Sequence, residues 1–99
     1  HRHPTRYHLL VDGKQVLPLG AERSGIDPND IGEQRWVTWT ARDGMKIPGI
    51  LDLPAGWTPD QGPLPTVIHP HGGPWSRDFG GWDASGWVPF LTSRGYAVL

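Results

Sequence analysis

The sequence predicts an α/β fold, and three of its features indicate that class. Two Asp-Gly pairs separate stretches of alternating polar and apolar residues, a pattern typical of antiparallel hairpins. Toward the C-terminus, a helix-like segment stands between two short apolar runs, Leu64–Ile68 and Tyr96–Leu99. A strand, a helical crossover and a second strand form the unit that builds parallel sheets. Because the chain stops inside the second apolar run, we expect this sheet to be part of an incomplete domain.

The first predicted hairpin joins Tyr7–Val11 to Gln15–Leu19 through Asp12 and Gly13. An Asp-Gly pair favours the type I′ turn, because both central residues of that turn take positive φ angles. The first element of the chain is therefore predicted to be antiparallel.

A polar segment, residues 20–34, follows this hairpin and contains Gly25, Pro28 and Gly32 without a sustained hydrophobic period. Such a composition is typical of a linker. We therefore expect two units, residues 1–34 and residues 35–99.

The second predicted hairpin joins Arg35–Arg42 to Met45–Leu53 through Asp43 and Gly44. Its second strand contains Pro48, which has no N–H to donate to a sheet ladder. We therefore expect this strand at the edge of a sheet or at a bulge.

The C-terminal part follows a Pro/Gly-rich connection, Pro54–Pro65. Leu64–Ile68 is apolar on both faces, which predicts a strand covered from both sides. A helix is expected over residues 87–94, because Arg94 and Gly95 match a helix C-terminus and Ser85 could cap its start. Tyr96–Leu99 is the second apolar strand.

Composition limits the partners of the chain. Its 99 residues carry a net charge of −1, and 19% are charged, so neither a nucleic-acid footprint nor an acidic tail is indicated. The sequence contains no cysteine, and it has no apolar stretch of the roughly eighteen residues that a membrane helix needs. We expect no nucleic-acid or membrane partner, and the sequence indicates neither a compartment nor an oligomeric state.

Four segments of the chain resemble a known family when they are taken in order. They are RYHLLVDGKQVLPLG (Arg6–Gly20), TARDGMKIPGILDLP (Thr40–Pro54), HPHGGPWSRD (His69–Asp78) and FLTSRGYAVL (Phe90–Leu99). The last three resemble the start of the catalytic domain of the prolyl oligopeptidase family of serine peptidases, especially its acylaminoacyl-peptidase-like members. The first resembles the last strands of the β-propeller that precedes this domain.

This resemblance implies an α/β-hydrolase fold and a Ser-Asp-His mechanism that acts on peptide substrates without a cofactor. It also implies that the three triad residues lie beyond Leu99. The isolated chain is therefore expected to be inactive.

Within this family, the HPHGGPW segment corresponds to the loop that supplies one donor of the oxyanion hole. By resemblance, the N–H of Gly73 is that donor, Gly72 and Gly73 let the backbone approach the substrate, and His71 shapes the loop. Some members carry a tyrosine at the His71 position, and its assistance to the oxyanion does not transfer to this chain.

Other interpretations of the same residues stay open at this stage. The glycine pair could be a plain turn, and His69 and His71 could chelate a metal, although no further ligand lies at suitable spacing. Arg77 and Asp78 could bind a substrate carboxylate or pair with each other, which we favour. We expect no metal site.

Two other classes of function also remain possible. Six tryptophans would suit a binding module with aromatic platforms, although Trp36 and Trp39 fall on opposite strand faces. An esterase or lipase would also carry an HGG loop, although Pro74 stands where such enzymes usually continue with glycine.

Overall fold

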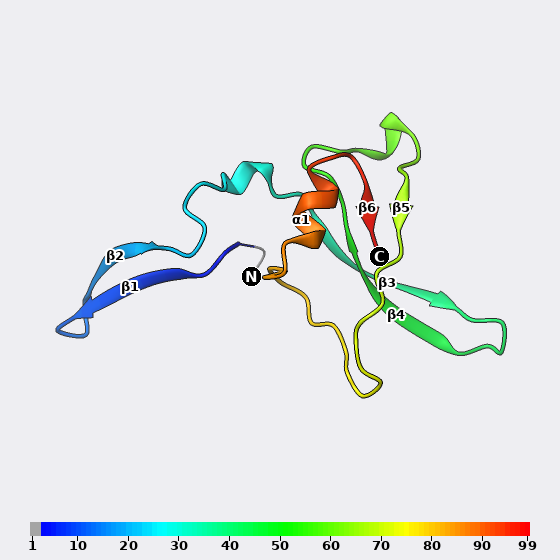
Figure 1. The fold of residues 1–99 in the computed structure, drawn as a ribbon, viewed down its shortest axis with the longest axis horizontal. Coiled ribbons are helices and arrows are strands. Elements are labelled where there is room, and N and C mark those ends of the chain that lie inside the picture. Colours follow the sequence, from blue (N-terminus) through cyan, green and yellow to red (C-terminus); the bar gives the residue numbers. More distant parts are fainter. Residues whose placement is uncertain (1–2) are drawn as a thin grey trace.

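The sheets of this chain form two separate hydrogen-bonded units. The structure is a computed structural model that describes residues 3–99. Its elements are β1 (Arg6–Val11), β2 (Gln15–Ala21), the 3-10 helix η1 (Pro28–Asp30), β3 (Gln34–Thr40), β4 (Lys46–Asp52), the 3-10 helix η2 (Pro59–Gln61), β5 (Thr66–Val67), α1 (Trp87–Thr92) and β6 (Ala97–Val98). One sheet contains β1 and β2, and the other has the order β3-β4-β6-β5 (Figure 1).

The first hairpin has the predicted turn. Asp12 and Gly13 have φ angles of 49° and 66°, so both central residues are left-handed, as a type I′ turn requires. The register shifts between Tyr7 and His8, and β2 continues to Ala21, two residues beyond the predicted end. This hairpin projects away from the rest of the chain (Figure 1).

The second hairpin closes with a turn of a different conformation from the first. The N–H of Ala41 donates to Met45 at 2.8 Å, the N–H of Gly44 donates back to Ala41 at 2.9 Å, and Gly44 has a φ of 89°. A tight turn followed by a left-handed glycine gives this geometry. Strand β4 lies between β3 and β6 and has no bulge opposite β3, so the prediction of an edge or bulged strand is wrong. Pro48 is tolerated because it lies opposite Thr38 with its backbone nitrogen facing away from β3, and β6 pairs with β4 only at Asp52.

Strand β6 joins the hairpin to the parallel part of the sheet. It pairs antiparallel with β4 through Asp52 and Val98, and parallel with β5 through two residue pairs. The predicted strand, helix and second strand are therefore present, although the two strands are shorter than expected.

Helix α1 ends two residues before the predicted Arg94. The N–H of Gly95, whose φ is 85°, donates to Thr92, and the N–H of Tyr96 donates to Leu91. This pair of bonds is the Schellman pattern that terminates helices. Ser85 does not cap the helix, because its hydroxyl donates to Asp83 instead.

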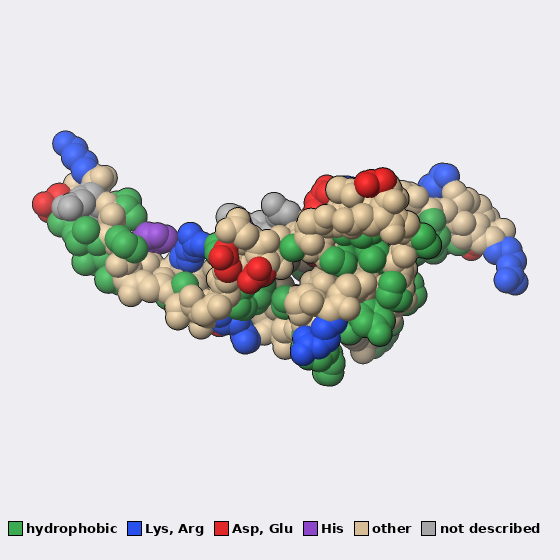
Figure 2. Space-filling model, turned by 90° about the horizontal axis from the view of Figure 1, so that it is seen from above, with side chains coloured by type: hydrophobic (Ala, Val, Ile, Leu, Met, Phe, Trp, Pro, Cys, Tyr) green, Lys and Arg blue, Asp and Glu red, His purple; other side chains and the backbone are tan. Residues whose placement is uncertain are grey.

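Few apolar side chains are buried in residues 3–99. Leu53, Ala97 and Val98 form the buried core. Ile68 is 66% exposed, so the prediction that its strand is covered on both faces is wrong, because none of the elements within residues 3–99 covers that end of the strand. Hydrophobic side chains gather on the surface seen in Figure 2.

The molecule is extended along one axis. Its radius of gyration is 16.7 Å, whereas a compact chain of this length has about 13 Å. The described part of the chain contains no helix that is long and apolar enough to cross a membrane. The division at residue 34 stays a prediction, although β3 begins at that residue.

Candidate functional site

The candidate site is the HPHGGPW loop, which we define as residues 69–81. It follows β5, the third strand of the larger sheet in chain order, and leads to α1, the first α-helix after that sheet begins. The N–H of His69 donates to the carbonyl of Leu99 at 2.7 Å, which extends the parallel pairing by one residue. Residues 70–80 are exposed beyond this point. The loop is therefore attached to the sheet where the strand ends.

Gly73 has a backbone conformation that favours glycine. Its φ is 152°, and a Cβ at this position would lie 3.0 Å from the nitrogen of Trp75 and 3.3 Å from that of Ser76. Within residues 3–99, its own N–H donates to no backbone carbonyl. This N–H is therefore available to an external acceptor. Gly72 has open space around it, so the structure explains glycine at position 73 better than at position 72.

His71 makes a contact inside the loop. Its Nδ1 lies 2.6 Å from the carbonyl oxygen of Gly72. Because a carbonyl only accepts, Nδ1 must carry the proton, and in the neutral ring Nε2 is then an acceptor. Through Nδ1, His71 thus bonds to the backbone of the loop. The described residues include no group of three or more His, Cys, Asp or Glu side chains that could hold a metal ion.

Arg77 and Asp78 do not form the expected pair. The guanidinium of Arg77 lies 5.0 Å from the ring centroid of Phe79, and the described residues contain no ion pair between Arg77 and Asp78. A cation over an aromatic face is attracted by the ring quadrupole, so the aromatic contact takes the place of the ion pair. The predicted pairing with Asp78 is therefore wrong, and a structural role for Arg77 stays a prediction.

An open hollow of about 1150 Å³ lies between the loop and the sheet. Its lining combines apolar side chains of the sheet with His69, His71 and Arg77 of the loop. Trp36 is 63% exposed, and the ring of Trp39 lies against Gly49, where a Cβ would come within 2.7 Å of it. The two tryptophans belong to opposite strand faces, as predicted, and so do not form one flat platform.

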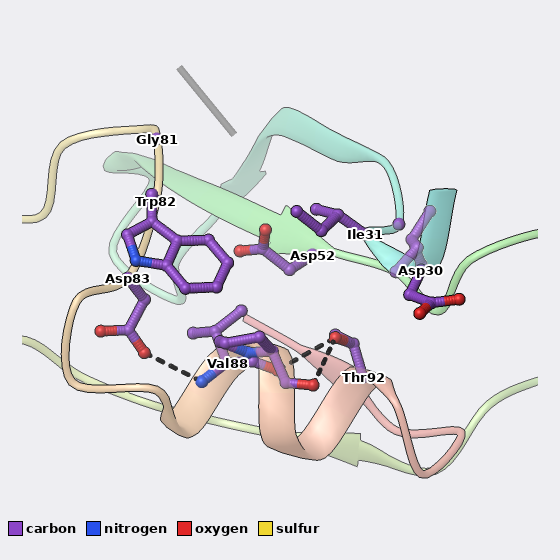
Figure 3. Close-up of a pocket in the computed structure, with 11 residues that line it drawn as sticks. Asp30, Ile31, Asp52, Gly81, Trp82, Asp83, Val88 and Thr92 are labelled. Carbon is purple, nitrogen blue, oxygen red and sulfur yellow. Dashed lines mark hydrogen bonds between the residues drawn. The ribbon is translucent and has the colours of Figure 1, made fainter. Parts of the chain in front are cut away.

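A polar cluster holds the C-terminal end of the loop. The side-chain oxygen of Gln34 accepts the N–H of Gly81 at 2.8 Å, and its amide nitrogen donates to Asp52 at 2.8 Å. Asp52 and Trp82 line a pocket of about 30 Å³ together with residues of η1 and α1 (Figure 3). This volume is about that of one water molecule.

The pKa values of the two carboxyl groups of this cluster, Asp52 and Asp83, are shifted in opposite directions. Burial raises the pKa of Asp52, and the charge of Asp83 raises it further, although the bond from Gln34 opposes both. Burial also acts to raise the pKa of Asp83, but hydrogen bonds from Ser85 and Val88 outweigh it and hold that pKa below its usual value. Asp83 is thus the better-stabilised anion, and its Oδ2 accepts the Val88 N–H at 2.9 Å at the start of α1 (Figure 3).

Trp82 presents a buried polar atom at the same place. Its Nε1 is buried and has no hydrogen-bond partner among the described residues. A buried indole N–H usually finds an acceptor.

The sequence alone did not indicate a role for Gln34, Asp52, Trp82 or Asp83. Asp83 stands shortly before the helix, a position where acidic residues cap helix ends, so it could have been found. Gln34 and Asp52 carried no such signal, because their partners are distant in the sequence.

Comparison with known proteins relates the chain to a peptidase. Dipeptidyl aminopeptidase BIII of Pseudoxanthomonas mexicana is 38% identical over 89 residues. The match covers 85% of this chain and 13% of the relative, so the chain spans about an eighth of that protein. No family model and no solved structure matches the chain. The chain is thus similar to one short segment of a peptidase.

Proposed function

We propose that this chain is a segment of a serine peptidase of the prolyl oligopeptidase type, and that its HPHGGPW loop supplies one half of the oxyanion hole. The position of the loop carries this proposal. It connects the third strand of the larger sheet, β5, to the helix α1. In α/β-hydrolases, the connection between the third strand and the first helix supplies one of the two oxyanion N–H groups. The similarity to a peptidase supports the same assignment.

The chemistry needs a preorganised donor. Attack on a peptide carbonyl places negative charge on its oxygen, and removing one donor from an oxyanion hole costs about 3–4 kcal/mol of transition-state stabilisation. The N–H of Gly73 donates to no backbone carbonyl within residues 3–99, and any side chain at Gly73 would crowd the backbone of Trp75 and Ser76. Gly73 is therefore the donor in this proposal, and His71 maintains the loop through its bond to Gly72.

The nucleophile is proposed to lie outside these 99 residues. The hydroxyls of Ser85 and Ser93 donate to Asp83 and to the carbonyl of Phe90. In the described residues, no serine hydroxyl is hydrogen-bonded to a histidine, which a seryl nucleophile needs as its base. We therefore propose that the triad comes from the rest of the full-length protein, and that residues 1–34 are the end of a propeller and its linker.

The substrate class follows from the relative. Because that protein is named a dipeptidyl aminopeptidase, we propose peptides as substrates and release of N-terminal dipeptides as the activity. Removal of a blocked N-terminal residue, one of the activities that the sequence resemblance left open, becomes the alternative. Dipeptidyl and acyl-aminoacyl chromogenic substrates distinguish the two.

The test is the Gly73→Val variant of the full-length protein. We expect kcat to fall about a hundredfold with a smaller change in KM, because one transition-state donor is displaced. Gly25→Val is the matched control, since no atom lies within 4 Å of a Cβ there.

Titration with a fluorophosphonate probe gives the concentration of active enzyme in each sample. The labelled serine is expected outside residues 1–99. An unchanged kcat in folded Gly73→Val would contradict the role of Gly73 as the oxyanion donor. Labelling at Ser76, the serine within the loop, would contradict the placement of the nucleophile outside residues 1–99.

A further inference from the structure

The HPHGGPW loop is tied to the sheet by hydrogen bonds at its two ends. At the first end, the His69 N–H donates to the carbonyl of Leu99 at 2.7 Å. At the second end, Gly81 is held by the side chain of Gln34. Residues 70–80 between them are exposed. The position of the Gly73 N–H therefore depends on both ends.

The Gln34 amide uses its oxygen and its nitrogen together. The oxygen accepts the Gly81 N–H at 2.8 Å, and the nitrogen donates to the Gly81 carbonyl at 3.3 Å and to Asp52 at 2.8 Å. A Cβ at Gly80 would lie 3.0 Å from the same side-chain oxygen, so the backbone of the loop approaches Gln34 closely. Asp52 fixes which way the amide faces, because a carboxylate only accepts.

We propose that Gln34 is a positioning residue for the oxyanion loop. This rests on the proposed function. Gln34 lies at the start of β3 and Asp52 at the end of β4, where the two are paired across the strands. The Asp52–Gln34–Gly81 connection transfers the rigidity of the sheet to the end of the loop, so that the Gly73 N–H is oriented before substrate arrives. Small misplacements of such a donor reduce the rate strongly.

The first test compares Gln34→Leu with Thr38→Leu in the full-length protein. Thr38 is an exposed position on the same face of the same strand, so its variant introduces the same side chain without touching the loop. Gln34→Leu is expected to lower kcat about tenfold with KM within about twofold, because substrate binding is kept and transition-state stabilisation is lost. Thr38→Leu is expected to retain kcat. A folded Gln34→Leu with the kcat of Thr38→Leu would overturn the proposal.

Gln34→Glu keeps the proposal testable if Gln34→Leu fails to fold. The introduced carboxylate still accepts the Gly81 N–H, but it faces Asp52. Asp83 and His69 line the same hollow as residue 34, and Asp30 lines the small pocket beside Asp52. Two adjacent carboxylates share a proton, so the connection holds at low pH and opens as the proton leaves. The kcat ratio of variant to wild type is expected to fall between about pH 5 and 8. A flat ratio would contradict the positioning role.

Hydrogen exchange separates this proposal from the proposed function. In Gln34→Leu, the amide of Gly81 is expected to exchange at least tenfold faster than in Thr38→Leu. An inactive wild-type protein that still shows this difference would reject the peptidase assignment and keep the loop anchor. An active wild-type protein without the difference would reject the anchor alone.

Discussion

The two hairpins of this chain begin from the same turn residues and have different surroundings. Each is closed by an Asp-Gly pair. The hairpin β1–β2 forms a sheet of its own, whereas β3–β4 continues into β6 and β5. Leu9, Leu10 and Leu17 of the first hairpin are exposed, whereas Leu53, directly after the second, is 4% exposed. Turn chemistry thus determines that a hairpin forms, and long-range contacts determine whether it becomes part of a core.

The contacts that distinguish the second hairpin are concentrated at its open end. The N–H of Leu53 donates to Glu33 at 2.9 Å, Asp52 pairs with Val98, and Gln34 joins Gly81. From the segment that follows the first hairpin, the Arg23 guanidinium donates to the carbonyl of Ala84 at 3.2 Å. This exposed bond is weaker support than a buried core, because water competes for both groups.

Gly32→Ala gives the largest expected effect on this comparison. A Cβ at Gly32 would overlap the carbonyl oxygen of Leu53 and lie 2.8 Å from the carbonyl carbons of Leu53 and Pro54. Backbone atoms cannot move aside as a flexible side chain does, so we expect a loss of about 3 kcal/mol or more. Hydrogen exchange of the full-length protein should show faster exchange in β3 and β4 and no change in β1 and β2.

Gly25→Ala is the control for that measurement, because no atom lies within 4 Å of a Cβ at Gly25. Its exchange should match wild type throughout. Equal acceleration of both hairpins in Gly32→Ala would show that the two sheets unfold together, and the contrast between them would be lost.

Whether the sequence could predict a feature of the fold or of the site depends on how far apart in the sequence the interacting residues lie. The turn at Asp12 and Gly13, the second hairpin and the strand, helix and strand order follow from local patterns, and the structure has them. The strand of Pro48 was expected at an edge or a bulge, but β4 lies between β3 and β6 because β6, 46 residues along the chain, pairs with its end. Burial of Ile68 was predicted wrongly. An apolar run favours burial of a strand, but it does not show that another element is present to cover that strand. Gln34 could not be found, because its partner Gly81 is 47 residues away and glycine has no side chain to suggest pairing.

Asp83→Ala is expected to cause an intermediate loss of stability, confined to α1 and the larger sheet, β3-β4-β6-β5. Its carboxylate accepts the N–H groups of Ser85 and Val88 at 2.9 Å each. Losing such a cap costs about 1–2 kcal/mol, and Asp83→Asn should lose less because it keeps one oxygen acceptor.

The contribution of Asp83 to stability depends on pH. Because the pKa of Asp83 is lowered by folding, its contribution is full above its unfolded pKa of about 3.9 and is lost as the pH falls through the folded value. Thermal melting of Asp83→Ala and wild type from pH 3 to pH 7 checks this. If the variant loses as much stability at pH 3 as at pH 7, the charged Asp83 does not act as a cap.

Asp52→Asn gives the smallest expected effect. Unlike the preceding substitutions, it is expected to increase the stability of the folded state. The pKa of Asp52 is raised by burial and by Asp83, so the folded state favours its protonated form, and stability declines as the pH rises through the folded value. Asparagine keeps an oxygen acceptor for Gln34 and removes the repulsion with Asp83, so the variant should be slightly more stable than wild type at pH 7. Solvent screening limits the gain to about 1 kcal/mol or less. At about pH 3, where the wild-type carboxyl is largely protonated in both the folded and the unfolded state, the difference should be close to zero. Melting curves of the full-length variant and wild type, measured at both pH values, test this prediction. A variant that is less stable than wild type at pH 7 would mean that the charge of Asp52 stabilises the larger sheet.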